Sequence, residues 1–86
     1  MSNDRSDRTV RDGFLNTVQE QIASGDPPVV RATRDRLVGQ GLSENEAAQM
    51  IAIVLRNEMK QMISESRSFD DVRFAGLLHQ LPTLPH

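Results

Sequence analysis

Residues 42–64 have the sequence LSENEAAQMIAIVLRNEMKQMIS, and this stretch decides the fold. Ser43 is followed three residues later by Glu46, which is the pattern of a capping box. In a capping box each of the two side chains satisfies a free backbone N–H at the start of a helix. We therefore predict a helix of some twenty residues that ends near Ser64 and, at ~1.5 Å per residue, spans the whole domain.

Residues 50–55 within this stretch, MIAIVL, are apolar in six successive positions. Six helical positions cover every side of a helix, so we expect this segment to be buried all round. After residue 55 the apolar residues occupy only one side of the predicted helix, and Glu58 and Lys60 are expected on the solvent side. An 86-residue chain is too small to cover such a helix with three neighbours, which predicts a homodimer. The expected dimer contacts are Met50, Ile53, Met59 and Met62.

Two further helices are predicted before this one. Apolar residues at every fourth position between 10 and 22 predict a helix over residues 9–24, which ends at Gly25. Asp26 and the two prolines after it predict the start of a second helix over residues 27–38. Its expected inward positions are Val29 or Val30, Thr33 and Leu37.

A short fourth helix is predicted over residues 69–80, with Ser68 and Asp71 as its capping pair. It would bury Val72 or Phe74, Leu77 or Leu78, and Leu81. The predicted fold is therefore all-α, a four-helix bundle-like domain with a long central third helix. We expect residues 1–8 to be a disordered N-terminal segment, residues 9–81 a single helical domain and residues 82–86 an extended tail.

The composition excludes several classes of function. Ten basic and twelve acidic residues give a net charge of −2, which argues against binding to nucleic acid or to a membrane surface by bulk charge. The acidic opening of the third helix also argues against a helix-turn-helix DNA reader, because it would repel phosphates. No apolar run reaches the ~18 residues of a membrane span. The absence of cysteine fits a cytoplasmic protein.

Few residues of this chain can carry chemistry. The only histidines are His79 and His86, so we expect no metal site and no cofactor. The serines lie at predicted caps and turns, without a partner for nucleophilic catalysis. Acidic pairs occur only in the first turns of predicted helices, where the helix dipole favours them. We therefore expect a protein that is not an enzyme.

Residues 27–41 carry a local excess of positive charge, because they contain three arginines and one aspartate. Arg31 and Arg34 share a helix face at a spacing of three residues. They are expected either to form ion pairs with neighbouring acids or to bind an anionic ligand or an acidic peptide. The preferred function is a helical protein–protein interaction module that self-associates, and the alternative is a regulatory protein that binds an anion through Arg31 and Arg34.

Two resemblances accompany these inferences. Residues 36–47, RLVGQGLSENEA, resemble the helix–loop–helix opening of ubiquitin-associated-type domains. This resemblance implies an apolar partner surface that includes Gly41 and Leu42.

The second resemblance covers most of the chain. Glu20-Gln21, the start at Pro27-Pro28, Arg36-Leu37-Val38, Gly41, Glu46-Ala47, Ile51, Phe69-Asp70 and Leu81-Pro82 together are similar to a family of small helical bacterial domains without an established activity. Histidines in many members of that family imply a metal or polar site. Leu15, Asn45 and Gln49 stand where those histidines would fall, which implies that the site is lost or altered here.

Overall fold

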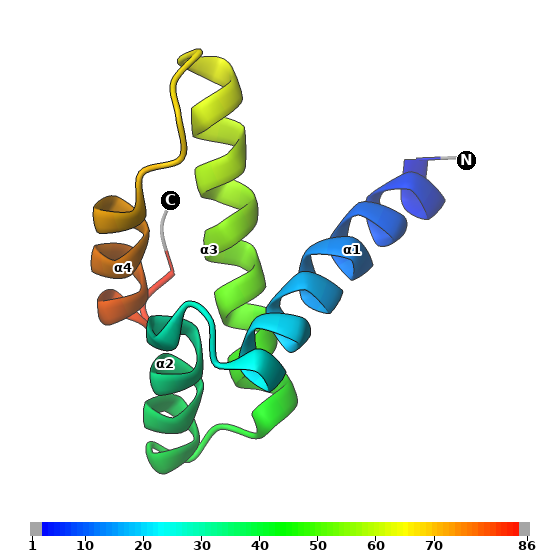
Figure 1. Ribbon diagram of the computed structural model, residues 1–86. Helices are drawn as coiled ribbons and strands as arrows, with labels where there is room; N and C mark the ends of the chain where they lie inside the picture. The colour runs from blue at the N-terminus through cyan, green and yellow to red at the C-terminus, as the bar shows by residue number, and fades with distance from the viewer. Residues whose placement is uncertain (1–2, 85–86) are drawn as a thin grey trace.

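The computed structural model describes the backbone of residues 3–84 and the side chains of residues 13–84 (Figure 1). Its helices are α1 (Asn3–Ser24), α2 (Pro28–Gly39), α3 (Glu44–Ser64) and α4 (Asp71–Gln80). No strand occurs in this described part of the chain. Helix α3 is central because α1, α2 and α4 all pack against it. The predicted all-α, bundle-like fold with a central third helix and a short fourth helix is thus confirmed.

The start of α3 has the predicted capping box. The Ser43 hydroxyl accepts a hydrogen bond from the Glu46 N–H at 3.0 Å, and Glu46 Oε1 accepts one from the Ser43 N–H at 2.9 Å. The Ser43 N–H stabilises the carboxylate, and so it lowers the pKa of Glu46 below the ordinary 4.5. Both contacts are local in sequence, which explains why a four-residue pattern predicted them.

We expect Ser43→Ala to lower the free energy of unfolding by about 1 kcal/mol at neutral pH, because an N-cap is lost. Urea denaturation followed by far-UV circular dichroism measures this, with Ser64→Ala at the exposed far end of α3 as the control. Since the pKa of Glu46 is lowered on folding, its contribution is present above pH 4.5 and is lost as pH falls through the lowered pKa. Equal stability of Ser43→Ala and wild type at neutral pH would contradict the prediction.

The starts of three helices differ from the predictions. Helix α1 begins at Asn3 instead of near residue 9, since residues 3–8 contain no proline or glycine to stop it. Residues 1–2 and 85–86 of the two predicted terminal segments lie outside the described residues. Helix α2 has Pro27 at its N-cap, without a side-chain hydrogen bond, so the predicted capping by Asp26 is wrong.

The start of α4 was also predicted two residues too early. Asp70 is its N-cap, and its carboxylate accepts a hydrogen bond from the Arg73 N–H at 3.0 Å. Ser68 lies outside the helix and does not cap it. Of the alternatives predicted for the core, Phe74 and Leu78 are buried, whereas Val72 is 84% exposed.

The hydrophobic core lies where α1, α2 and α4 meet the first two-thirds of α3. The predicted inward residues of α2, Val30, Thr33 and Leu37, are all buried. The apolar segment 50–55 is buried at four positions and half-buried at Met50 and Ile53, so one copy of the chain covers most of it. The buried apolar side chains are Val18, Ile22, Val30, Leu37, Ala47, Ala48, Ile51, Ala52, Val54, Leu55, Phe74, Leu78 and Leu81.

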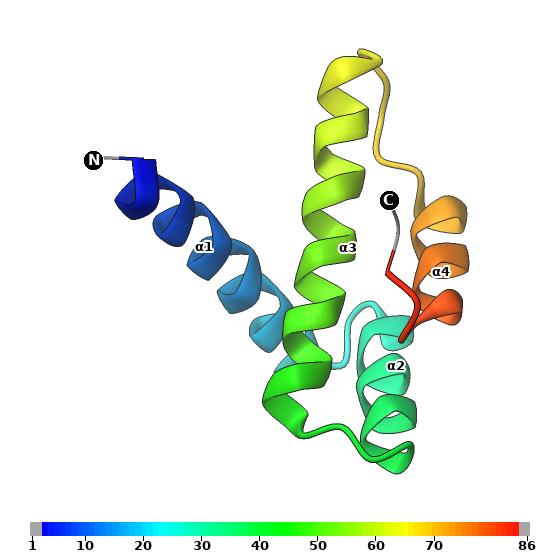
Figure 2. The ribbon, with the colours of Figure 1, turned by 180° about the vertical axis from the view of Figure 1, so that it is seen from behind.

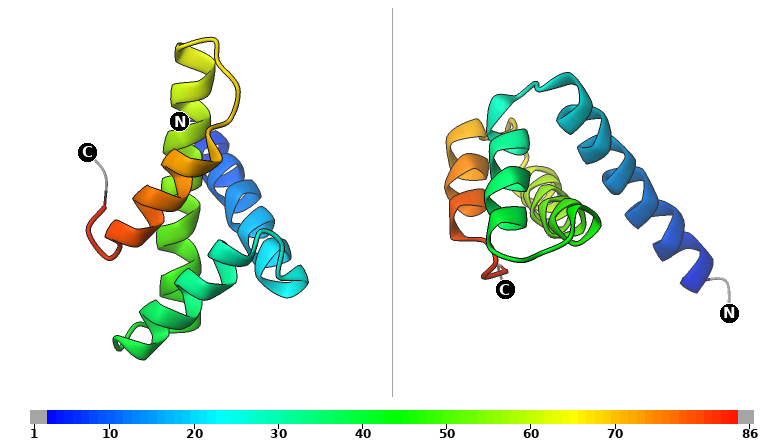
Figure 3. Two further views of the ribbon diagram at one scale, coloured as in Figure 1. Left: turned by 60° about the vertical axis from the view of Figure 1, so that its left-hand side comes forward. Right: turned by 90° about the horizontal axis from the view of Figure 1, so that it is seen from below.

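Helix α1 gives the molecule an open shape. It contacts α2 and α3 near its C-terminal end and then diverges from α3, so that its first turns project from the body (Figures 1, 2 and 3). The backbones of α1 and α4 do not approach each other closely within the described residues, although both helices pack on α3. The radius of gyration is 13.0 Å, compared with ~12 Å for a compact chain of this length.

Candidate functional site

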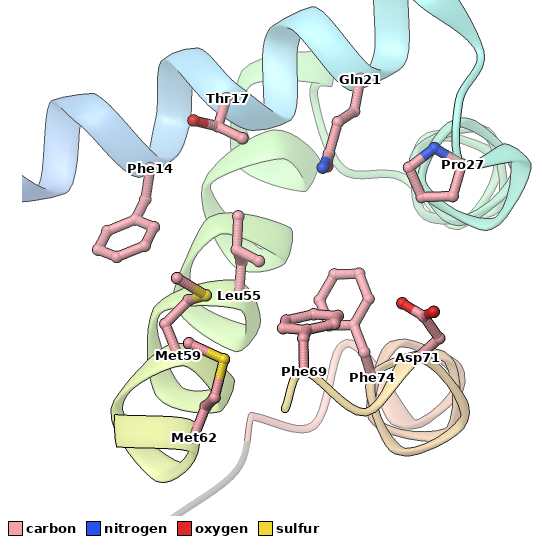
Figure 4. Close-up of a pocket in the computed structure, with 10 residues that line it drawn as sticks. All are labelled: Phe14, Thr17, Gln21, Pro27, Leu55, Met59, Met62, Phe69, Asp71 and Phe74. Carbon is pink, nitrogen blue, oxygen red and sulfur yellow. The ribbon is translucent and has the colours of Figure 1, made fainter. Parts of the chain in front are cut away.

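An apolar groove lies over α3, between α1 and the start of α4 (Figure 4). Its volume is about 570 Å³, which is within the usual ~300–1,000 Å³ of ligand pockets. We call it the aromatic groove. The residues that line it are Phe14, Thr17, Gln21, Pro27, Leu55, Met59, Met62, Phe69, Asp71 and Phe74.

All three aromatic residues of the chain meet in this groove. Phe14 comes from α1, Phe69 from the connection between α3 and α4, and Phe74 from α4. The rings of Phe69 and Phe74 lie edge to face, with centroids 5.4 Å apart and planes at 62°. Phe74 is buried, whereas Phe14 and Phe69 are only half-buried and present apolar surface to the groove. The scarce aromatic side chains are therefore concentrated at one open site.

The four methionine and isoleucine residues predicted as dimer contacts do not form one surface. Met59 and Met62 line the aromatic groove. Met50 and Ile53 are half-buried on the same helix but do not line it, because they lie on a different side of α3. The structure thus unites half of the predicted set with the three aromatic residues.

A buried carboxylate fixes the wall of the groove that carries Phe69. Glu58, expected on the solvent side, is buried: its side chain is 0% exposed. Its Oε2 lies 2.9 Å from Arg67 Nη1, and its Oε1 lies 3.0 Å from Arg73 Nε. Arg67 belongs to the connection after α3 and Arg73 to α4, so both elements are tied to one residue of α3.

The charges of this cluster support each other. The Glu58 carboxylate, with a smaller contribution from Glu65, raises the pKa of Arg67, which therefore stays charged at every ordinary pH. Arg67 Nε also lies 2.7 Å from Glu65 Oε1. The cluster was not foreseen because neither arginine belongs to α3, so the helical pattern of α3 does not place them beside Glu58.

The two arginines predicted to bind an anion are engaged within the chain. Arg31 donates from Nε to the Ile22 carbonyl and from Nη2 to the Ala23 carbonyl, both at 2.9 Å. It therefore holds the C-terminal end of α1, beside Gly25 in its left-handed conformation (φ +73°). Arg34 donates to Asp35 at 2.6 Å and to Glu44 at 3.1 Å.

Arg36, which the sequence left without a role, has the same kind of contact at another helix end. Its Nη1 donates to the Leu81 carbonyl and its Nη2 to the Leu78 carbonyl, both at 2.9 Å. Free carbonyls at a helix C-terminus favour a cation, so Arg36 holds the end of α4. Two arginines of α2 thus stabilise the ends of two other helices.

The positions named by the two resemblances are dispersed. Leu15 is half-buried against the core, while Asn45 and Gln49 are exposed on α3. Leu42 packs against the core beside Gly41, which has a φ of +106°. Among the residues that the structure describes, no three His, Asp or Glu side chains gather where they could hold a metal ion.

Sequence reasoning missed Gln21 and Asp71 as groove residues and did not connect the three phenylalanines. The signal that was available is that these three phenylalanines are the only aromatic residues of the sequence. None of the described helices has the length and hydropathy needed to cross a membrane. No family model, curated protein or solved structure matches this chain.

Proposed function

We propose that the protein is a non-enzymatic helical interaction module that self-associates, with a second copy covering the aromatic groove. The observation that carries this proposal is the convergence of all three aromatic residues and two methionines on an open groove. Phenylalanine and methionine are enriched at protein interfaces, and methionine adapts readily to a partner surface.

The exposed area supports a partner of this kind. The chain exposes 5798 Å², whereas a compact folded monomer of 9.6 kDa exposes about 5,100 Å². The excess of about 700 Å² is close to the ~800 Å² that each partner buries in a standard interface.

The contacts of Arg31 and Arg34 favour this proposal over anion binding. Both guanidinium groups already donate to carbonyl or carboxylate oxygens of the chain itself. An incoming anion would have to displace these contacts, whereas a partner at the aromatic groove displaces only water from apolar surface.

Light scattering coupled to size-exclusion chromatography tests the proposal over a range of protein concentrations. We expect the mass to rise from 9.6 kDa towards twice that value by high micromolar concentration. A mass of 9.6 kDa at every concentration would refute self-association.

We also propose a cytoplasmic location. The support is the lack of cysteine in a small domain, since small secreted domains commonly rely on disulfides. Fractionation of cells that express the tagged chain would test it, and recovery outside the cytoplasm would contradict it.

A further inference from the structure

All the sulfur of this chain is in methionine side chains. The sequence has four methionines and no cysteine, tryptophan or tyrosine, so a peroxide finds its most reactive targets in the thioethers. Met50, Met59 and Met62 lie in the part of the chain whose side chains are described, and all three are half-buried. Each of these side chains therefore keeps some exposure to solvent.

Met62 differs from the other two in what it contacts. Met50 and Met59 pack against the hydrophobic core, whereas Met62 lines the aromatic groove without belonging to the residues packed on that core. Figure 4 shows the side chain of Met62 extending from α3 into the groove. A chemical change at the Met62 sulfur therefore alters the surface of the groove and leaves the packing of the core in place.

The groove has no side-chain donor at the Met62 end among the residues that the structure describes. The Gln21 amide nitrogen lies at the other end of the groove in Figure 4. Thr17 donates its hydroxyl proton within α1, Asp71 can only accept, and the two arginines of the Glu58 cluster do not line the groove. An oxygen atom on the Met62 sulfur, once covered by an apolar partner, would be a buried acceptor without a hydrogen bond.

We propose that Met62 is an oxidation site at which hydrogen peroxide forms the sulfoxide and thereby dissociates the dimer. The O–O bond of the peroxide breaks and an S–O bond forms. The thioether sulfur loses two electrons, the peroxide is reduced, and its second oxygen leaves as water. A methionine sulfoxide reductase would restore the thioether. This inference rests on the proposed self-association and adds its regulation.

Oxidation takes place in the free monomer, because a second copy covers the groove in the proposed dimer. Monomers and dimers exchange by mass action, so each oxidised chain is removed from the pool that can pair. Met62 should therefore be oxidised more slowly at a protein concentration where most chains are dimeric than in dilute protein. Met50 lies outside the groove, and its rate should not depend on concentration in this way.

Sedimentation equilibrium before and after treatment with hydrogen peroxide gives two dissociation constants for each protein, and their ratio is the readout. Because each variant is compared with itself, its starting affinity does not enter the ratio. We expect the dissociation constant of the wild type to rise at least about tenfold on oxidation, since a polar oxygen is then buried without a partner. Peptide mass spectrometry assigns the added oxygen to individual methionines, and far-UV circular dichroism checks the fold.

Two leucine variants locate the sensitive residue. Leucine has a volume similar to that of methionine and has no sulfur to oxidise. Met62→Leu should therefore lose most of the tenfold response to peroxide. Met50→Leu, outside the groove, is the matched control and should respond as the wild type does. The slower oxidation of Met62 in concentrated wild-type protein provides a second measurement that needs no variant.

Four outcomes would overturn the proposal. These are an unchanged dissociation constant although Met62 is oxidised, a response that is lost in Met50→Leu and kept in Met62→Leu, an oxidation rate of Met62 that is independent of protein concentration, and loss of the helical signal on oxidation. In each case a concentration-dependent mass before treatment would still support self-association. A mass of 9.6 kDa at every concentration before treatment would instead refute self-association and the regulation with it.

Discussion

Replacing Arg67 and Arg73 together with methionine will lower the free energy of unfolding by about 3–5 kcal/mol. The loss arises at Glu58, whose fully buried carboxylate would then have no cation within reach. The methionines retain the length and the apolar stems of the arginines, so lost packing contributes little. Urea denaturation followed by far-UV circular dichroism measures the change.

A third substitution distinguishes charge from packing in this experiment. Adding Glu58→Leu to the double variant removes the unpaired charge and keeps a side chain of similar volume, so most of the stability should return. Arg56→Met is the matched control, since Arg56 is exposed on α3 and its loss should change stability by less than about 0.5 kcal/mol. If the double variant is as stable as wild type, water reaches Glu58 and the cluster does not tie α4 to α3.

The second large effect concerns self-association. Met62→Gln should weaken the dimer by roughly thirtyfold or more, equivalent to ~2 kcal/mol, because a central apolar contact of the aromatic groove becomes polar. Met62 is half-buried and is not part of the buried core, so folding should be little affected. Sedimentation equilibrium gives the dissociation constant of each variant.

Two controls locate the interface. Val72→Thr changes a highly exposed apolar side chain that does not line the groove, and it should leave the dissociation constant unchanged. Ile53→Asn tests the part of the predicted contact set that lies away from the groove. If Ile53→Asn disrupts the dimer and Met62→Gln does not, the interface lies on the other flank of α3 and the groove is free.

The sequence predicted those parts of the fold that depend on neighbouring residues. The capping box at Ser43 and the left-handed stop at Gly25 each need only a few consecutive positions, and both are confirmed. The end of α3 near Ser64 also agrees with the prediction. Helix starts were less accurate. Helix α1 begins six residues before its predicted start, and at α2 and α4 several residues near each start can act as a cap and the tertiary structure selects one.

The candidate site was largely beyond sequence reasoning for a physical reason. Helical periodicity assigns a charged residue such as Glu58 to the solvent side. Its carboxylate can be buried only because ion pairs with Arg67 and Arg73 offset the free-energy cost of removing the charge from water. Met59 was recognised as apolar, but its partners come from α1 and α4, which the periodicity of α3 does not specify. Pairings between distant elements therefore had to come from the structure.

Helix α2 links two helices whose backbones lie apart. Its Arg31 holds the last carbonyls of α1, and its Arg36 holds those of α4, although the backbones of α1 and α4 do not come close to each other among the described residues. Loosening this twelve-residue helix would release both ends at once. Amide protons near Ala23 and near Leu78 would then exchange with solvent through one shared opening event. The helices α1 and α4, which form two walls of the groove, would in that case open together as a single cooperative unit.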